Sequence, residues 1–330
     1  MAKIAILGTG AWGTALANVL LTNSNNVFMW GIDQNEINDL KHGVNAKYYG
    51  QHKLINKLDV VGCNIHEVLQ FNPDYVIIAV PSIHIENTIQ LALKYLTNKP
   101  VFINVAKGFD QKTKKTWSIT IEKLIKNKAK GLVTLIGPSF AIEVFNKEIT
   151  IVNTVSKNKT LATKVAKIFQ NNYFKCVAIN DVIGAETISA LKNVMAIGSG
   201  ILYSQHTSIN TRSAILAQMT KEISLIVKVL GGKTETVYQY CGIGDIFLTC
   251  TDSKSRNFSF GQAIGQKGFK QICKELKIHT VEGYWATQTA HEIIKKYKLH
   301  APVIEHVYNV LYKNEDAKKF VYSIFKEVKF

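Results

Sequence analysis

Hydrophobic and polar positions alternate in two patterns along the first 180 residues of the chain. Short, continuous apolar runs are followed by longer segments in which apolar residues return every three or four positions. The first pattern is typical of strands buried on both faces, and the second of helices that cover a sheet. We therefore expect strands at residues 4–7, 27–32, 75–80, 100–105, 132–136, 149–155 and 174–179. Helices are expected at residues 14–21, 83–96 and 116–126. This alternation predicts a parallel sheet with helices on both faces.

The pattern changes after residue 180, where helical spacing dominates and strand-like runs become rare. A chain of 330 residues is long enough for two hydrophobic cores. No low-complexity linker separates the two parts. We therefore predict the α/β class, with a doubly wound parallel sheet at residues 1–180 and an all-helical second domain at residues 181–330.

Three glycines follow the first predicted strand in the spacing G-x-G-x-x-G, namely Gly8, Gly10 and Gly13. In a dinucleotide-binding turn, the first glycine permits the tight turn, the second lets a pyrophosphate approach, and the third lets helix and strand pack closely. The following helix directs its free N–H groups at the phosphates. A purely structural glycine turn is the alternative. The position between a strand and a helix favours a Rossmann-like, NAD(P)-binding first domain.

Asp33 ends the second predicted strand, twenty residues after Gly13. A Rossmann carboxylate at this place accepts a hydrogen bond from the adenosine ribose. Asp33 can also cap the helix that begins at Gln34, and the two roles are compatible. No arginine or lysine follows Asp33 before Lys41. We therefore expect nothing there to bind the 2′-phosphate of NADP, which favours NAD.

Turn residues, hydroxyl groups and a cation follow three further predicted strands. Ser82, Lys107 and Ser139 each come within a few residues of a strand end. Parallel sheets bind ligands beyond the carboxyl ends of their strands. Lys107 stands between a buried strand and Gly108, which favours a ligand role over that of a solvated surface lysine.

Lys192 interrupts an apolar helical segment at residues 182–202. It shares a helix face with Ile188, Met195 and Ala196. Desolvation in such company disfavours the ammonium form and lowers the pKa of a lysine toward neutrality, which suits a general acid. The alternative is a lysine on the exposed edge of a buried helix.

A second polar cluster lies at residues 240–257. Asp245 either caps a helix or orients a cation such as Lys192. Ser255, Arg256 and Asn257 supply a hydroxyl, a guanidinium and an amide in succession, a set suited to gripping a phosphate. A solvent-facing loop is the alternative for these three residues.

The composition excludes some classes of function. The formal net charge of +16 comes from lysines spread along the chain, and Arg212 and Arg256 are the only arginines. Because nucleic-acid readers use arginine for bidentate contacts, we expect no nucleic-acid partner but an attraction for anionic substrates.

No apolar run approaches the ~20 residues of a membrane span, and the first strand leaves no room for a signal peptide. The five cysteines form no C-x-x-C pair, which favours reduced thiols, a cytoplasmic location and no metal site.

Seven short segments, spread in order over nearly the whole chain, carry a family resemblance. They are GTGAWGTALA from Gly8, VAKG from Val105, GPSFAIE from Gly137, LKNVMAIGSG from Leu191, GIGDIFLTCT from Gly242, SRN from Ser255 and VEGY from Val281. Together they resemble the soluble NAD(P)-dependent glycerol-3-phosphate dehydrogenases of the bacterial type.

The resemblance implies a reaction and the residues that carry it. NAD(P)H would deliver a hydride to the ketone carbon of dihydroxyacetone phosphate, giving the sn-glycerol 3-phosphate that supplies phospholipid synthesis. Lys192 matches the catalytic proton donor, and Asp245 lies beside it. The substrate-binding positions are matched by Lys107, Gly137, Ser139, Ser255, Arg256 and Asn257. Cofactor contacts are matched by Ala11, Trp12, Ala141, Thr280 and Glu282, and Lys107 and Arg256 also border the cofactor.

One departure from the family bears on the cofactor. Many bacterial relatives carry histidine or arginine after the second strand, where it can meet the 2′-phosphate of NADP. Here Ile32 occupies that position and Asp33 follows. We therefore expect NADH to be used as well as NADPH, or better.

Two other functions remain as alternatives. A related dehydrogenase of a 3-hydroxy acid or sugar acid would share the glycine loop but would not need the phosphate grip at residues 255–257. A non-catalytic NAD-binding regulator would not need Lys192 and Asp245, and both are present. The oligomeric state stays open, with a homodimer among the alternatives.

Overall fold

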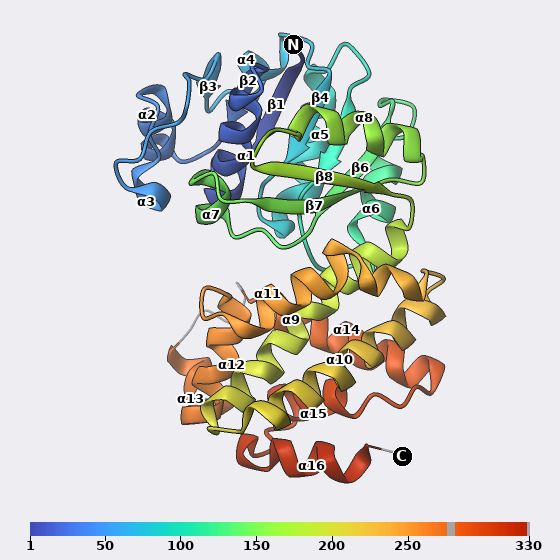
Figure 1. The fold of residues 1–330 in the computed structure, drawn as a ribbon. Coiled ribbons are helices and arrows are strands. Elements are labelled where there is room, and N and C mark those ends of the chain that lie inside the picture. The colour runs from blue at the N-terminus through green and yellow to red at the C-terminus, as the bar shows by residue number, and fades with distance from the viewer. Residues whose placement is uncertain (276–280, 329–330) are drawn as a thin grey trace. The chain divides into compact units, whose positions relative to one another are not determined.

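The structure is a computed structural model that describes residues 1–275 and 281–328. Its internal contacts divide the chain into two compact units. Unit 1 comprises Met1–Lys107 and Trp117–Val182, and unit 2 comprises Gly108–Thr116 and Ile183–Phe330. The chain therefore passes from one unit to the other three times. Figure 1 shows the sheet of unit 1 in blue to green, and the helices of unit 2 in yellow-green to red.

Unit 1 is built on one eight-stranded sheet with the order β3-β2-β1-β4-β5-β6-β7-β8. The strands are β1 (Lys3–Leu7), β2 (Asn26–Trp30), β3 (Val60–Gly62), β4 (Tyr75–Ile78), β5 (Val101–Asn104), β6 (Gly131–Ile136), β7 (Thr150–Val155) and β8 (Phe174–Ile179). Neighbouring strands are parallel from β3 to β6, whereas β7 is antiparallel to β6. The connection from β6 to β7 holds only the five-residue helix α7 (Ala141–Phe145), so the chain turns back instead of crossing a face of the sheet.

The seven strands predicted from the sequence are all present, with ends that differ by no more than two residues. The sequence did not indicate β3. This strand has three residues at the edge of the sheet, which is too short a run to show a period of two.

Alternate residues of the central strand β1 enter different cores. Ile4 and Ile6 belong to one hydrophobic cluster, and Ala5 and Leu7 belong to another. Since successive side chains of a strand point to opposite faces, both faces of the sheet are buried, which explains the unbroken apolar run. Residues of α1, α7 and α8 cover the first face, and residues of α4, α5 and α6 cover the second. The unit 1 helices, besides α7, are α1 (Ala11–Thr22), α2 (Gln34–Lys41), α3 (Ala46–Tyr49), α4 (Ile65–Leu69), η1 (Ser82–His84), α5 (Ile85–Tyr95), α6 (Trp117–Leu124) and α8 (Lys159–Phe169).

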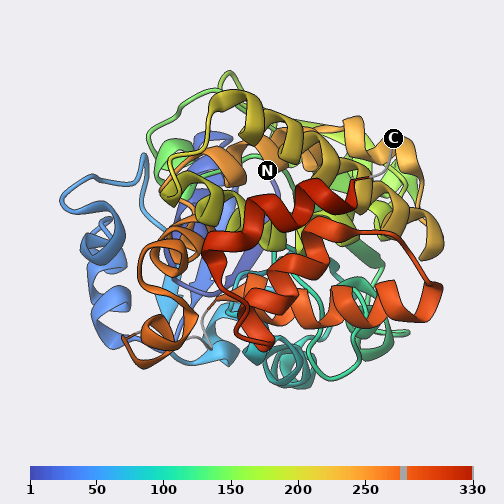
Figure 2. The same ribbon diagram turned by 90° about the horizontal axis from the view of Figure 1, so that it is seen from below.

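Every regular element that the structure describes in unit 2 is helical, as the spacing after residue 180 predicted. These elements are α9 (Val182–Ser204), α10 (Ile209–Val229), η2 (Thr234–Tyr238), η3 (Tyr240–Gly244), α11 (Asp245–Thr251), α12 (Arg256–Lys267), α13 (Phe269–Glu275), α14 (Glu282–Tyr297), α15 (Pro302–Tyr312), η5 (Ala317–Lys319) and α16 (Phe320–Glu327). Figure 2 shows α15 and α16, drawn in red, packed against each other. Among the described residues, no helix has the length and apolarity needed to cross a membrane.

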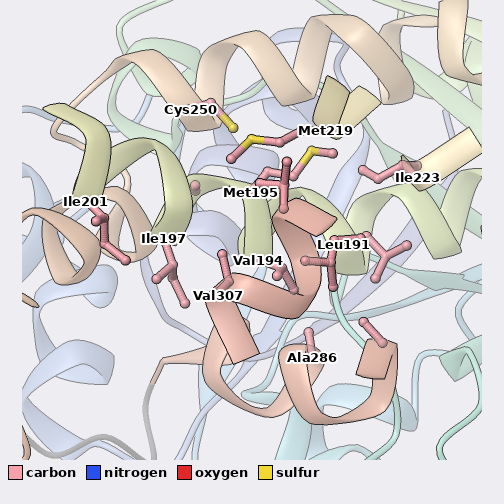
Figure 3. Packing of buried hydrophobic residues seen from close by; sticks show 14 of the residues in the cluster. Leu191, Val194, Met195, Ile197, Ile201, Met219, Ile223, Cys250, Ala286 and Val307 are labelled. Atoms are coloured by element: carbon pink, nitrogen blue, oxygen red, sulfur yellow. The ribbon is translucent and has the colours of Figure 1, made fainter. Parts of the chain in front are cut away.

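Helix α9 is the centre of the unit 2 core. Nearly all of its side chains are buried, including Leu191, Val194 and Ile197. Met219 of α10 and Val307 of α15 belong to the same hydrophobic cluster (Figure 3). A helix that is apolar all round must be surrounded by others, and a charged side chain on it must therefore find partners inside the protein.

Candidate functional site

The turn between β1 and α1 requires glycine at two positions. Gly8 has φ +130°, and a Cβ there would lie 2.5 Å from the carbonyl oxygen of Ala79. A Cβ at Gly13 would lie 2.3 Å from the carbonyl oxygen of Gly8. The loop therefore packs against the segment after β4 and against its own helix, as the spacing of the glycines suggests.

The middle glycine of the loop faces open space. No heavy atom lies within 4 Å of the Cβ position at Gly10. Helix α1 begins directly after it, with Ala11 and Trp12 partly exposed, and its first turn has no side-chain cap and no acidic residue. Free N–H groups at the positive end of a helix dipole attract a phosphate. These features fit the pyrophosphate of a dinucleotide.

The other predicted unit 1 residues gather at the same edge of the sheet. β1, β4, β5 and β6 are adjacent and parallel, so the loops after them leave from one side. Lys107 follows β5, and Gly137 and Ser139 follow β6. The Ser139 hydroxyl donates a hydrogen bond of 3.0 Å to the Gly137 carbonyl. Ala141 is the first residue of α7. Unit 1 thus brings together the glycine loop, a lysine and a hydroxyl.

Asp33 caps helix α2 and also binds a lysine. Its Oδ1 accepts hydrogen bonds from the backbone N–H groups of Asn35 (2.9 Å) and Glu36 (3.3 Å). Lys47 Nζ lies 3.1 Å from its Oδ2. This hydrogen bond from Lys47 is the main cause that lowers the pKa of Asp33. The expectation that no cation lies beside Asp33 is therefore wrong, because helix α3 brings back a lysine from fourteen positions further along the chain.

Lys192 and Asp245 form a buried ion pair inside unit 2. Lys192 Nζ lies 2.6 Å from Asp245 Oδ1, and the two side chains are 3% and 0% exposed. Lys192 comes from the middle of α9, and Asp245 is the first residue of α11. A carboxylate in the first turn of a helix is favoured by the helix dipole.

A threonine of α11 also contacts this ammonium. Lys192 Nζ donates a second hydrogen bond, of 2.9 Å, to Thr249 Oγ1. The Thr249 hydroxyl in turn donates to the backbone carbonyl of Asp245 at 2.6 Å, so its lone pair is directed at the lysine. Burial alone would favour a neutral amine, but the carboxylate favours the charged form. The result is an oriented ammonium, which can act as a proton donor.

The predicted phosphate-binding residues lie at the start of α12. Ser255 is the N-cap of that helix, and its hydroxyl accepts a hydrogen bond from the N–H of Phe258 at 3.3 Å. Arg256 is exposed and forms no ion pair with any residue that the structure describes. Asn257 Oδ1 accepts a hydrogen bond of 2.9 Å from the N–H of Gly283.

A second contact connects the start of α14 to α9. Glu282 Oε2 lies 3.4 Å from Asn193 Nδ2, and Asn193 is the neighbour of Lys192 in sequence. Together with the Asn257 contact, this bond joins the segments that begin at Leu191, Ser255 and Val281. Thr280 lies outside the described residues.

Sequence reasoning missed two residues of these clusters. Thr249 had a signal, because it stands four positions after Asp245 and so shares its helix face. Lys47 had none, since only the folded loop after α2 brings it to Asp33. Within the described part of the chain, no group of three or more His, Cys, Asp or Glu side chains is arranged to hold a metal ion.

Two family models match the chain. One describes the N-terminus of NAD-dependent glycerol-3-phosphate dehydrogenase and matches residues 3–162, and the other describes its C-terminus and matches residues 181–322. The glycerol-3-phosphate dehydrogenase (NAD(P)+) of Malacoplasma penetrans is 41% identical over 322 residues, covering 96% of this chain and 94% of the relative. The corresponding protein of Enterococcus faecalis is 34% identical over 323 residues, covering 96% and 93%.

Solved structures agree with the sequence matches. The crystal structure of glycerol-3-phosphate dehydrogenase from Coxiella burnetii aligns with a TM-score of 0.87 at 27% identity, covering 98% of this chain and 99% of that one. A 3-hydroxyisobutyrate dehydrogenase of Mycobacterium tuberculosis aligns with a TM-score of 0.54 at 13% identity, which shows a shared fold alone. By both family models and by relatives matched over nearly its whole length, this chain belongs to the NAD-dependent glycerol-3-phosphate dehydrogenase family.

Proposed function

We propose that this chain reversibly reduces dihydroxyacetone phosphate to sn-glycerol 3-phosphate with NADH or NADPH. The observation that carries the proposal is the buried ammonium of Lys192, held by Asp245 and Thr249 in a member of this family. A protein that only bound the cofactor would have no use for a charged lysine in a helical core, where burial of a charge is costly. Reduction of a ketone needs such a proton donor.

The residues of unit 1 fit the binding of the cofactor. NAD(P)H, when bound, supplies the hydride. We assign the phosphates of the cofactor to Gly8, Gly10 and Gly13 with the first residues of α1, Ala11 and Trp12. Further cofactor contacts are assigned to Asp33, Ala141, Lys107, Arg256, Glu282 and Thr280.

Lys192 acts on the oxygen of the substrate. As the ketone carbon gains a hydride, its oxygen gains negative charge, and the ammonium of Lys192 stabilises that charge and transfers a proton to it. The product is the alcohol, and Lys192 is left as a neutral amine that takes a proton from solvent. In the reverse direction, the neutral amine accepts the hydroxyl proton as the hydride leaves. Asp245 and Thr249 position the amine in both directions.

The phosphate of the substrate is assigned to a separate set of residues. Arg256 is exposed and uncommitted to other ions in the described chain, and a guanidinium binds phosphate through two parallel hydrogen bonds. Because the phosphate is remote from the reacting carbon, its binding energy can position the ketone. The assigned residues are Lys107, Gly137, Ser139, Ser255, Arg256 and Asn257.

A direct assay tests this function. NADH oxidation is followed with dihydroxyacetone phosphate and, as the matched control, with dihydroxyacetone, which lacks only the phosphoryl group. We expect turnover of the phosphorylated ketone and a kcat/KM for dihydroxyacetone lower by at least about 10³-fold. Similar kcat/KM values for both ketones would contradict a phosphate site, and reduction of neither would contradict the function.

The cellular role follows from the product. Glycerol 3-phosphate made in the cytoplasm would supply the backbone of phospholipids, and we assign the chain to that compartment and role.

A homodimer is the assembly to test first. Light scattering after size-exclusion chromatography measures the mass, and a mass twice that of the 36.9 kDa chain is the expected result.

A further inference from the structure

Residues 45–49, here called the α3 segment, are tied to the glycine loop and to α2. Asn45 is fully buried, and its Nδ2 donates to the carbonyl of Thr9 at 2.9 Å. The hydroxyl of Tyr49 donates to the carbonyl of Ala11 at 2.5 Å. Two side chains from opposite ends of the segment therefore hold it against the loop that would bind the cofactor phosphates. Lys47 lies between these two residues in the segment.

The ammonium of Lys47 joins two carboxylates. It lies 2.6 Å from Glu36 Oε1 and 3.1 Å from Asp33 Oδ2. Glu36 is buried and also accepts hydrogen bonds from Thr9 Oγ1 at 2.6 Å and from the Tyr48 hydroxyl at 3.0 Å. Of the two carboxylates, Glu36 is therefore buried and held by hydrogen bonds, whereas Asp33 faces solvent.

Lys47 remains accessible to a ligand. Its side chain is 54% exposed and that of Asp33 is 36% exposed, so a bound molecule can reach both. The hydrogen bonds to Glu36 and Asp33 raise the pKa of Lys47, which keeps the lysine charged at neutral pH. A cation that is anchored on one side and exposed on the other can change its second partner.

We propose that Lys47 determines how well the chain accepts NADPH beside NADH. With NADH, Lys47 stays on Asp33, whose carboxylate accepts a hydrogen bond from the ribose 2′-hydroxyl. With NADPH, Lys47 keeps its bond to Glu36 and exchanges Asp33 for the 2′-phosphate. This inference rests on the dinucleotide site of the proposed function, and it deepens that proposal by naming a residue for cofactor choice.

The charges of the cluster set the direction of the preference. Asp33 and Glu36 bring two negative charges, and Lys47 brings one positive charge. One negative charge therefore remains uncompensated, which disfavours a 2′-phosphate relative to a 2′-hydroxyl. Without Lys47, Asp33 would face the phosphate and neither its charge nor that of the buried Glu36 would be compensated. The structure thus explains why NADH is expected to be used at least as well as NADPH, although a cation lies beside Asp33.

Binding measurements on the full chain test this role without turnover. The variant is Lys47→Ala, the probes are NADPH, NADH, 2′,5′-ADP and ADP, and the readout is the dissociation constant by calorimetry. We expect the constants for NADPH and 2′,5′-ADP to rise by about fivefold or more, while those for NADH and ADP change by less than about twofold. Lys41→Ala, an exposed lysine at the end of α2, is the matched control and leaves all four constants unchanged. Lys47→Arg keeps the cation and restores the binding of NADPH.

Two results would overturn the proposal. Equal weakening of the phosphorylated and unphosphorylated probes would mean that Lys47 only supports the loop. Unchanged binding of all probes would mean that Lys47 does not reach the ribose. If the wild-type chain binds NADH and NADPH but reduces no dihydroxyacetone phosphate, the proposed function fails while the role of Lys47 is still decided by the binding data.

Discussion

Each unit of this protein contains a lysine that contacts an aspartate, and the two pairs differ in burial. Lys47 and Asp33 of unit 1 are 54% and 36% exposed, with 3.1 Å between the atoms. Lys192 and Asp245 of unit 2 are 3% and 0% exposed, with 2.6 Å between them. A solvated pair is weak and can exchange partners with a ligand, whereas a buried pair is fixed because either charge without the other is costly. The same two residue types thus suit ligand selection in one unit and proton transfer in the other.

The largest expected effect separates the two lysines by their role in turnover. Lys192→Ala should lower kcat by about 10³-fold or more, since the proton donor is removed, and should leave NADH binding nearly intact. Lys47→Ala is the comparison variant and should keep the kcat measured with NADH. Steady-state kinetics and NADH calorimetry on both variants measure this difference.

A control is needed because Lys192→Ala removes the ammonium that faces the buried carboxylate of Asp245. The double variant Lys192→Met, Asp245→Asn removes both charges together and should fold with the same loss of kcat. Turnover retained by either variant would take Lys192 out of the mechanism.

The next effect concerns stability. Asp245→Asn leaves the Lys192 ammonium in the core without its countercharge, and we expect the free energy of unfolding to fall by about 3 kcal/mol or more. Asp33→Asn should not shift the unfolding midpoint, because asparagine still caps α2 and the lysine remains hydrated. Urea unfolding of the two variants provides the measurement. Equal destabilisation by both changes would show that the burial of an ion pair does not determine how much its loss lowers the free energy of unfolding.

Glu222 is a buried carboxylate that accepts hydrogen bonds from backbone N–H groups and, unlike Asp245, has no lysine beside it among the contacts that the structure describes. Glu222 of α10 accepts hydrogen bonds of 3.0 Å from the N–H groups of Val303 and Ile304, and burial raises its pKa from 4.5 to about 7. The unfolded chain therefore loses this proton at lower pH than the folded chain. The contribution of Glu222 to the free energy of unfolding decreases as pH rises from 4.5 to about 7 and does not change further above that range. Glu222→Gln removes this dependence.

The test compares the wild type with Glu222→Gln by urea unfolding at pH 5 and pH 8. Relative to the variant, the wild type should lose about 2 kcal/mol of unfolding free energy between these two values. Other titrating groups are common to both proteins and cancel in the difference. A difference that stays constant with pH would mean that Glu222 is ionised throughout.

The sequence predicted most where local patterns determine the structure. The strands and the glycine loop depend on residues close together in the chain, so their apolar periods and glycine spacings could be recognised in the sequence. The contact between Lys192 and Asp245 could be suggested because an apolar helix needs a partner for its one central lysine. The reversed direction of β7 was not predicted, since strand direction depends on the path of the connection and not on the strand itself.

The sequence patterns did not predict the contacts that loops make with one another. Nothing in the residues between α2 and β3 indicates that Lys47 returns to Asp33 and Glu36. Its position follows from the bonds of Asn45 and Tyr49 to the glycine loop, which form only when the loop and the segment are both folded. The absence of a cation next to Asp33 in sequence was therefore no guide to the charges around it.

The threefold passage of the chain between its units limits how the protein can be dissected. Residues 108–116 lie within the first half of the sequence, yet Phe109 packs in the same hydrophobic cluster as Leu191 and Val194. A fragment that stops at residue 182 would contain residues 108–116 but would lack the unit 2 core against which Phe109 packs. The exposed side chain of Phe109 would then promote aggregation. An isolated nucleotide-binding unit made from this protein would therefore need residues 108–116 replaced by a short hydrophilic linker between Lys107 and Trp117.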